Sequence, residues 1–323
     1  MERFAILLLA SCVIAPAAAQ EKMARVGWLQ WQSSGVHTDQ IGKGFLQGLS
    51  EGGFVEGKNL VLMRRSAEGD RKRFPALARE MADAGVDVFF APTKVGADAA
   101  WYASRSTPTV IAAVNDPVAL GYVKSLARPG TQVTGVLTSN ADLTGKRLQL
   151  LAEMVPGLKR VGVLIDEAIL ETCRQELDQT EAAAQKLGIS LIRVSAGNKI
   201  ELDAAFKRLA KEKAQAVITT LVTTSGGLEA EEIELVQKHR LPMIHQWELA
   251  TRMGGLISYG PDFADVYRRA GLYVARILKG AKPAEMAIEF PREFRMVVNH
   301  KSAKQLGIAI PQSVLLRANE VIE

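Results

Sequence analysis

The feature that most constrains the fold of this chain is a regular alternation of short β-rich runs with amphipathic helical stretches. The β-rich runs predict strands at 24–29, 60–64, 86–91, 109–114, 133–137, 160–165, 189–194, 216–221, 243–245 and 256–258. Between these runs, apolar residues recur at helical spacing, and Gly or Pro ends several of the helices. Strand–helix–strand units with short loops predict parallel sheets, right-handed crossovers and helices on both sheet faces.

The alternation restarts near residues 138–140, which divides the chain into two blocks of similar architecture. The expected helices are one that ends at 52–53, one capped by Asp70, a short one that ends at 127, and those at about 95–104, 143–154, 167–187, 201–211 and 228–239. A chain of 323 residues is long enough for two domains of about 150 residues each. Because open parallel sheets bind ligands outside the carboxyl ends of their strands, two such lobes can share a cleft.

The first residues of the chain are typical of a secretory leader. Arg3 is followed by an apolar run over 4–15, then by a proline and three alanines that end at Ala19. We expect cleavage after Ala19 and export of the mature protein. The residues that end at Cys12 also fit the pattern that precedes a lipid-modified cysteine, so a lipid anchor through Cys12 is the alternative. No later run of about 18 uninterrupted apolar residues predicts a membrane span.

Composition and motifs exclude several classes of protein. The 40 basic and 35 acidic residues are mixed along the chain and leave a net charge of +5, without the basic block that binds nucleic acid. The chain has no GxSxG, P-loop or HExxH motif, and its four histidines lack metal-ligand spacing. After cleavage Cys173 is the single cysteine, which excludes an internal disulfide. We therefore expect no catalytic centre, no cofactor and no metal.

Several segments together match those of a known family. They are 45–49, 53–60 (Gly-Phe-Val-Glu-Gly-Lys-Asn-Leu), 116–118, 125–130, 133–135, 145–148, 258–262 (Ser-Tyr-Gly-Pro-Asp), 267–269 and 278–283. On these residues the chain resembles the ABC transporter substrate-binding proteins of the tryptophan/tyrosine-type uptake family. The resemblance covers essentially all of the mature chain, and its motifs are specific only in combination.

This resemblance implies an α/β fold of two Rossmann-like lobes with parallel sheets, joined by a three-crossover hinge, which is the type I periplasmic-binding-protein architecture. The first lobe would comprise 24–138 and about 260–283, and the second about 139–259 and 284–323. The implied protein is a periplasmic monomer that is not an enzyme. It would bind a small organic solute, of the amino-acid or aromatic and organic-acid class, and deliver it to an ABC permease in the inner membrane.

Strand ends select the residues that are expected to contact the ligand in the inter-lobe cleft. The candidates are Gln30, Trp31, Thr93, Lys94, Asn115, Asp116, Asp166, Thr223, Gln246, Trp247 and Tyr259. The two tryptophans would either stack on a flat ligand or serve as packing residues. The tyrosine belongs to the Ser-Tyr-Gly-Pro segment near a predicted crossover, where it would serve the hinge or the cleft.

Four polar candidates have structural alternatives. Thr93 could cap the helix that it precedes, and Asp116, which stands before a proline, could be a turn residue only. Asp166 could pair with an amine of the ligand or could simply begin the next helix. If Lys94 faces the cleft, it would favour an anionic group on the ligand.

Two other functions remain open at the level of sequence. An exported sensor of the same fold would signal through a membrane partner instead of delivering its ligand. An exported enzyme would use the cleft for turnover, although no catalytic constellation is present to indicate it. Return of the ligand unchanged would separate a binding protein from an enzyme.

Overall fold

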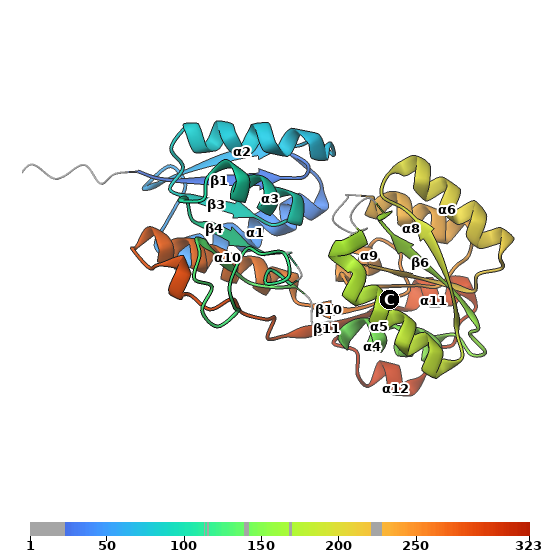
Figure 1. Ribbon diagram of the computed structural model, residues 1–323. Helices are drawn as coiled ribbons and strands as arrows, with labels where there is room; N and C mark the ends of the chain where they lie inside the picture. The colour runs from blue at the N-terminus through green and yellow to red at the C-terminus, as the bar shows by residue number, and fades with distance from the viewer. Residues whose placement is uncertain (1–22, 113, 115, 139–141, 168–169, 221–227) are drawn as a thin grey trace, which may run out of the picture.

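The computed structural model describes residues 23–323 except 113, 115, 139–141, 168–169 and 221–227, and it contains two α/β lobes (Figure 1). Each lobe is built on one sheet with hydrophobic clusters on both faces. The strand orders are β2-β1-β3-β4-β5 and β12-β11-β10-β9-β8-β6-β7. Near-continuous apolar strands are expected for parallel sheets that helices cover on both sides.

The first sheet consists of β1 (Ala24–Gln30), β2 (Leu60–Ser66), β3 (Val88–Ala91), β4 (Thr109–Ile111) and β5 (Val133–Gly135), all parallel. The helices of this lobe are α1 (Val36–Glu51), α2 (Phe74–Asp83), α3 (Lys94–Ala103) and α10 (Phe263–Leu278), with the 3-10 turns η1 (Arg71–Arg73) and η3 (Pro283–Glu285). Alternate strand residues point to opposite faces. Trp28 and Phe90 accordingly pack against α1 and α10, whereas Leu29 and Phe89 pack against α2 and α3.

The second sheet consists of β6 (Arg160–Ile165), β7 (Ser190–Ser195), β8 (Ala216–Thr219), β9 (Met243–His245), β10 (Ile257–Pro261), β11 (Phe294–Asn299) and β12 (Glu320–Ile322). Its strands are parallel except for the antiparallel pair β10 and β11. The helices of this lobe are α4 (Asp142–Met154), α5 (Leu170–Leu187), α6 (Lys199–Lys211), α8 (Glu229–Lys238), α9 (Glu248–Arg252), α11 (His300–Leu306) and α12 (Gln312–Leu315).

A glycine contact fixes α10 to the first lobe, although α10 follows a strand of the second sheet. A Cβ added at Gly48 of α1 would lie 1.8 Å from the Arg268 carbonyl oxygen, and one at Gly271 of α10 would lie 2.3 Å from that of Phe45. The two backbones therefore approach too closely for any side chain at these positions. This contact buries the apolar face of α10, which includes Val266 and Ala270, against α1.

The chain passes between the lobes three times: after β5, from β10 into α10, and between residue 289 and β11. Residues 284–289 stay beside the first sheet. The Gly130 N–H donates to the Ala284 carbonyl at 3.0 Å, and Glu289 pairs with Val136. These backbone hydrogen bonds extend the first-lobe segment beyond the limit of 283 expected from the sequence.

The segment after β4 differs from its expected short helix. Residues 117–121 form turns instead, and Asp116 has a φ of 43° while Gly121 has a φ of 74°. The Asp116 carboxylate accepts the Ala119 N–H at 2.9 Å, which closes the first turn. Left-handed residues at both ends of this segment interrupt a right-handed helix. Strands β3 and β4 are also shorter than expected, whereas β10 continues to Pro261.

Candidate functional site

The carboxyl ends of the strands in the two sheets approach one another. Arg71, in the turn η1 that follows β2, contacts Asp166, the residue directly after β6, with 2.7 Å between Nη2 and Oδ2. Gln30 ends β1, and Gln246 follows β9; both are buried. Because ligands of open parallel sheets bind at this edge, these residues define the candidate site.

Asp166 is a buried carboxylate at this edge. Its side chain is 6 % exposed, whereas that of Arg71 is 31 % exposed. A Cβ at Gly197 would lie 2.6 Å from Asp166 Oδ1, so the loop after β7 approaches this carboxylate closely only because residue 197 is glycine. A buried carboxylate needs a charge partner, and Arg71 from the opposite lobe supplies one.

Trp247 contacts both lobes where they meet. Its ring stacks on Phe263 with 4.7 Å between centroids, and its Nε1 donates to the Gln40 side chain at 2.9 Å. Gln40 and Phe263 belong to α1 and α10 of the first lobe, while Trp247 directly precedes α9 of the second. One face of this indole is therefore covered by protein.

Thr93 and Lys94 both make local contacts at the start of α3. The Thr93 hydroxyl accepts the Gly96 N–H at 3.1 Å, which makes it the N-cap of the helix. Lys94 pairs with Asp98 one turn later at 2.6 Å, and Asp98 also accepts the Tyr122 hydroxyl. Burial and then this carboxylate raise the pKa of the Tyr122 hydroxyl. The positive charge of Lys94 is thus already balanced within the first lobe.

The remaining predicted contacts lie in three different environments. Trp31 is half-buried and stacks on Phe74 with 6.0 Å between ring centroids. Asp116 is exposed in its turn, and Tyr259 is half-buried on β10, where it pairs in register with Met296. Two further predicted contacts lie outside the described residues: Asn115 and Thr223.

Sequence reasoning did not select Arg71 or the two buried charge clusters of the second lobe. Arg71 directly follows Asp70, the residue expected to cap a helix, and was not itself considered as a contact. Arg147 and Glu176 form a buried ion pair at 2.6 Å between α4 and α5. Burial lowers the pKa of the Arg147 guanidinium, and Glu176 opposes that shift. The signal available for Arg71 was its position, a basic residue close after a strand end.

The second buried cluster joins α8 to β9. Glu232 Oε2 lies 3.9 Å from His245 Nε2, and both side chains are almost completely buried. His245 Nδ1 accepts the Trp247 backbone N–H at 2.9 Å, so Nδ1 carries no proton. Burial, followed by the charges of Glu229 and Glu231, raises the pKa of Glu232 well above its ordinary value. This carboxyl group therefore favours its neutral, protonated form.

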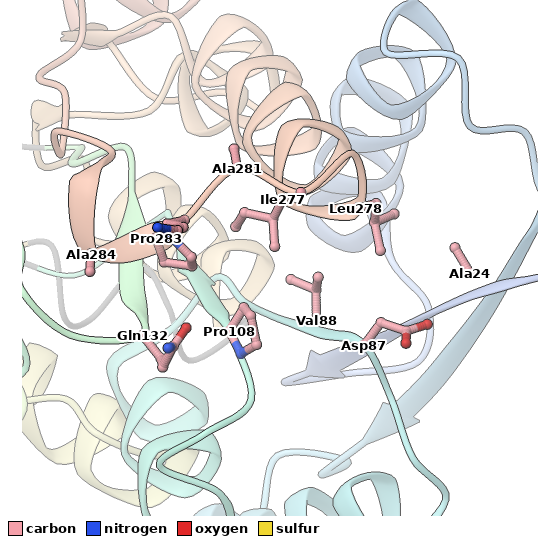
Figure 2. Close-up of a pocket in the computed structure, with 12 residues that line it drawn as sticks. Ala24, Asp87, Val88, Pro108, Gln132, Ile277, Leu278, Ala281, Pro283 and Ala284 are labelled. Carbon is pink, nitrogen blue, oxygen red and sulfur yellow. The ribbon is translucent and has the colours of Figure 1, made fainter.

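Two pockets lie at the opposite, amino-terminal ends of the strands. The larger one, of about 550 Å³, is in the first lobe beside the C-terminal end of α10 (Figure 2). Its lining includes Ala24, Val88 and Pro108, which begin or directly precede β1, β3 and β4. A second pocket of about 350 Å³ lies beside α8 and α11. Both pockets are separated from the candidate site by the length of the strands, because that site lies at the carboxyl ends.

The part of the chain that the structure describes holds no group of three or more His, Cys, Asp or Glu side chains placed to share a metal ion. Within the same residues, no helix has the length and apolar content needed to cross a membrane.

Two parallel-sheet lobes, a three-crossover hinge and a polar site between strand ends define the class of type I periplasmic binding proteins. The family model described as ABC transporter substrate binding protein matches residues 33–322, and the chain belongs to that family. This membership confirms the resemblance drawn from the sequence motifs.

Known relatives agree with this assignment. A tyrosine-binding protein of Clostridioides difficile strain R20291 is 25% identical over 274 residues, which cover 84% of this chain and 77% of that protein. The structure of an ABC domain in complex with L-Trp from Streptococcus pneumonia has a TM-score of 0.85 at 26% identity, covering 93% and 99% of the two chains. A conserved domain protein of Vibrio cholerae has a TM-score of 0.84 at 27% identity, covering 93% and 100%.

Proposed function

We propose that this protein binds a small organic solute between its lobes and delivers it, in the periplasm, to the inner-membrane permease of an ABC importer. The observation that carries the proposal is the meeting of charged groups from both lobes at the strand ends, where Arg71 and Asp166 lie 2.7 Å apart. A solute enclosed there would contact both lobes and favour their closed arrangement. Family membership supports the transport role, and the relatives that bind tyrosine or tryptophan make aromatic amino acids the first solutes to test.

The proposed ligand contacts differ in their position relative to the strand ends. Gln30, Thr93, Asp166 and Gln246 lie at strand ends and form the core of the proposed site, and Trp31 and Tyr259 flank it. Asn115 and Thr223 stay proposed contacts from the sequence alone, because they lie outside the described residues. Three others have prior partners and are placed at its margin: Lys94 with Asp98, Asp116 in its own turn, and Trp247 with Phe263.

A thermal titration tests the proposed function directly. The mature protein is unfolded and refolded to remove any solute that survives purification, then heated with L-tryptophan, L-tyrosine and a panel of amino, aromatic and organic acids. A ligand at 100 times its dissociation constant stabilises the folded state by about 2.7 kcal/mol, which moves the melting temperature measurably. Absence of any shift across the panel would contradict the proposed solute class. Mass spectrometry of the recovered ligand should find it unchanged, whereas conversion would indicate an enzyme.

A substitution at Gln30 tests where the solute binds. Gln30→Ala removes an amide at the carboxyl end of β1, and the loss of one hydrogen bond is expected to weaken binding about fivefold to tenfold. Gln132→Ala is the matched control, because Gln132 lines the pocket at the opposite end of the same sheet (Figure 2). Calorimetric titration of the solute identified above should give unchanged affinity for the control. The reverse pattern would move the site to that pocket.

The same proposal covers processing and assembly. We infer that the leader is cleaved after Ala19, so the protein recovered from the periplasm should begin at Gln20 by intact-mass measurement. A mass that carries a diacylglyceryl group on Cys12 would indicate the lipid-anchored form instead. Light scattering should give the mass of one chain, because a two-lobed binder closes on its ligand without a partner copy.

A further inference from the structure

One ion pair joins the two lobes at the edge of the proposed site. Arg71 belongs to η1 of the first lobe, and Asp166 follows β6 of the second. Nη2 of the arginine donates to Oδ2 of the aspartate at 2.7 Å. Since the partners belong to different lobes, the pair exists only while the lobes lie together.

The first lobe presents this arginine from a fixed backbone. Asp70 caps the turn η1 by accepting the Lys72 N–H at 2.9 Å, and the Arg73 guanidinium donates to the Ala67 carbonyl at 3.3 Å. The turn therefore holds the backbone of Arg71 in place, and its side chain projects toward the second lobe. Lys72 and Arg73 beside it are exposed.

The second lobe presents two acids toward Arg71. Asp166 is one, and Glu201 of α6 is near enough for the charge of Arg71 to act on it. Hydrogen bonds from Ser195 Oγ at 2.5 Å, from the Gly197 N–H at 3.0 Å and from Asn198 Nδ2 at 2.6 Å hold the Glu201 carboxylate in position. These hydrogen bonds, the Ser195 bond above all, lower the pKa of Glu201, with a smaller contribution from Arg71. The second lobe thus offers a preformed acidic receptor for one arginine.

We propose that Arg71 and Asp166 form an electrostatic latch that holds the lobes together before any solute binds. Separating the lobes breaks the ion pair between Arg71 and the buried carboxylate of Asp166, which makes opening costly. Arg71 is 31 % exposed, so dissolved salt can screen the attraction. The latch deepens the proposed function, on which its physiological role rests. It raises the population of the closed form and so reduces the cost of closing around a solute.

The test measures the distance between the lobes without any ligand. Spin labels at Lys58→Cys and Lys211→Cys, one exposed site in each lobe, are read by pulsed dipolar spectroscopy on a Cys173→Ser background. At low ionic strength we expect mainly the short distance, and a shift to longer distances as sodium chloride is added. Arg71→Met should lower the ratio of closed to open molecules at low salt at least about fivefold and should remove most of the salt dependence.

Controls separate the latch from effects on folding and charge. Asp166→Asn keeps the shape of the side chain and should open the protein as Arg71→Met does. Lys72→Met removes a neighbouring exposed charge from the same turn and should leave the distances as in the wild type. Arg71→Lys keeps a positive charge and should retain part of the salt dependence. A distance distribution of Arg71→Met equal to that of the wild type at low salt, or a wild-type distribution insensitive to salt, would overturn the proposal. Because no solute is present, this result is independent of the binding test described above.

Discussion

At the scale of single residues, local chemistry predicts a contact well when both partners are near in sequence. Thr93 was selected as a ligand contact with helix capping as its structural alternative, and its hydroxyl does accept the Gly96 N–H. Arg71 and Asp166 show the limit, because nothing in either segment indicates a partner 95 residues away. Glu232 shows it as well, since a glutamate in a helix reads as solvated until packing buries it against His245.

The buried Glu232 should make stability depend on pH. Its pKa is raised in the folded state, so between its unfolded and folded pKa values the folded protein binds more protons. The contribution of Glu232 to the unfolding free energy is therefore fully present at pH values below its unfolded pKa, near 4.5. This contribution is lost as the pH rises toward the pKa of Glu232 in the folded state. Glu232→Gln keeps the neutral form, and denaturant titrations at pH 5 and pH 8 should show a smaller loss of unfolding free energy than the wild type. Glu234→Gln, on the exposed face of α8, should lose as much unfolding free energy between pH 5 and pH 8 as the wild type. An equal loss in the wild type and both variants would contradict the prediction.

At the scale of elements, the periodicity of apolar residues located most helices and parallel strands. Each helix buries one apolar face, and each central parallel strand is buried on both faces. The expected strand at 243–245 coincides with β9, and the second-lobe helices expected at 143–154 and 201–211 correspond to α4 and α6. The segment 117–121 was misassigned because Asp116 and Gly121 adopt left-handed backbone angles that apolar spacing does not reveal. Strand β12 was not assigned, since its three residues are half-buried at the sheet edge and carry little pattern.

The contact of α1 with α10 gives a prediction at this scale. Gly48→Ala places a methyl group where the Arg268 carbonyl oxygen lies, so the helices must separate, at an expected cost of about 3 kcal/mol or more in unfolding free energy. Gly145→Ala in α4 is the matched control: its Cβ meets only Ala183 at 3.4 Å, and the better helix former should stabilise by about 0.5–1 kcal/mol. Urea unfolding measures both, and two similar values would refute the packing argument.

At the scale of the whole molecule, the lobes are joined by the chain and by contacts between groups distant in sequence. Trp247 makes one of these contacts, since its buried indole stacks on Phe263 of the first lobe. We expect Trp247→Ala to lower the free energy of unfolding by about 3–5 kcal/mol through the cavity it leaves. Gln40→Ala removes only the hydrogen bond to the indole and should cost about 1 kcal/mol. Comparable losses in denaturant unfolding of the two variants would show that Trp247 does not pack as described.

The sequence by itself determined the class of fold, the two blocks, the strand ends that carry polar residues and the family. Strand and helix periodicity, short loops and local motifs are properties of neighbouring residues, so one chain read from end to end contains them. The tertiary structure alone decided which strand ends meet and that Arg71 contacts Asp166. It also decided that Trp247 packs against Phe263 of the opposite lobe and that residues 284–289 remain with the first sheet. Each of these joins segments far apart in the sequence, and such contacts depend on how the hinge brings the lobes together.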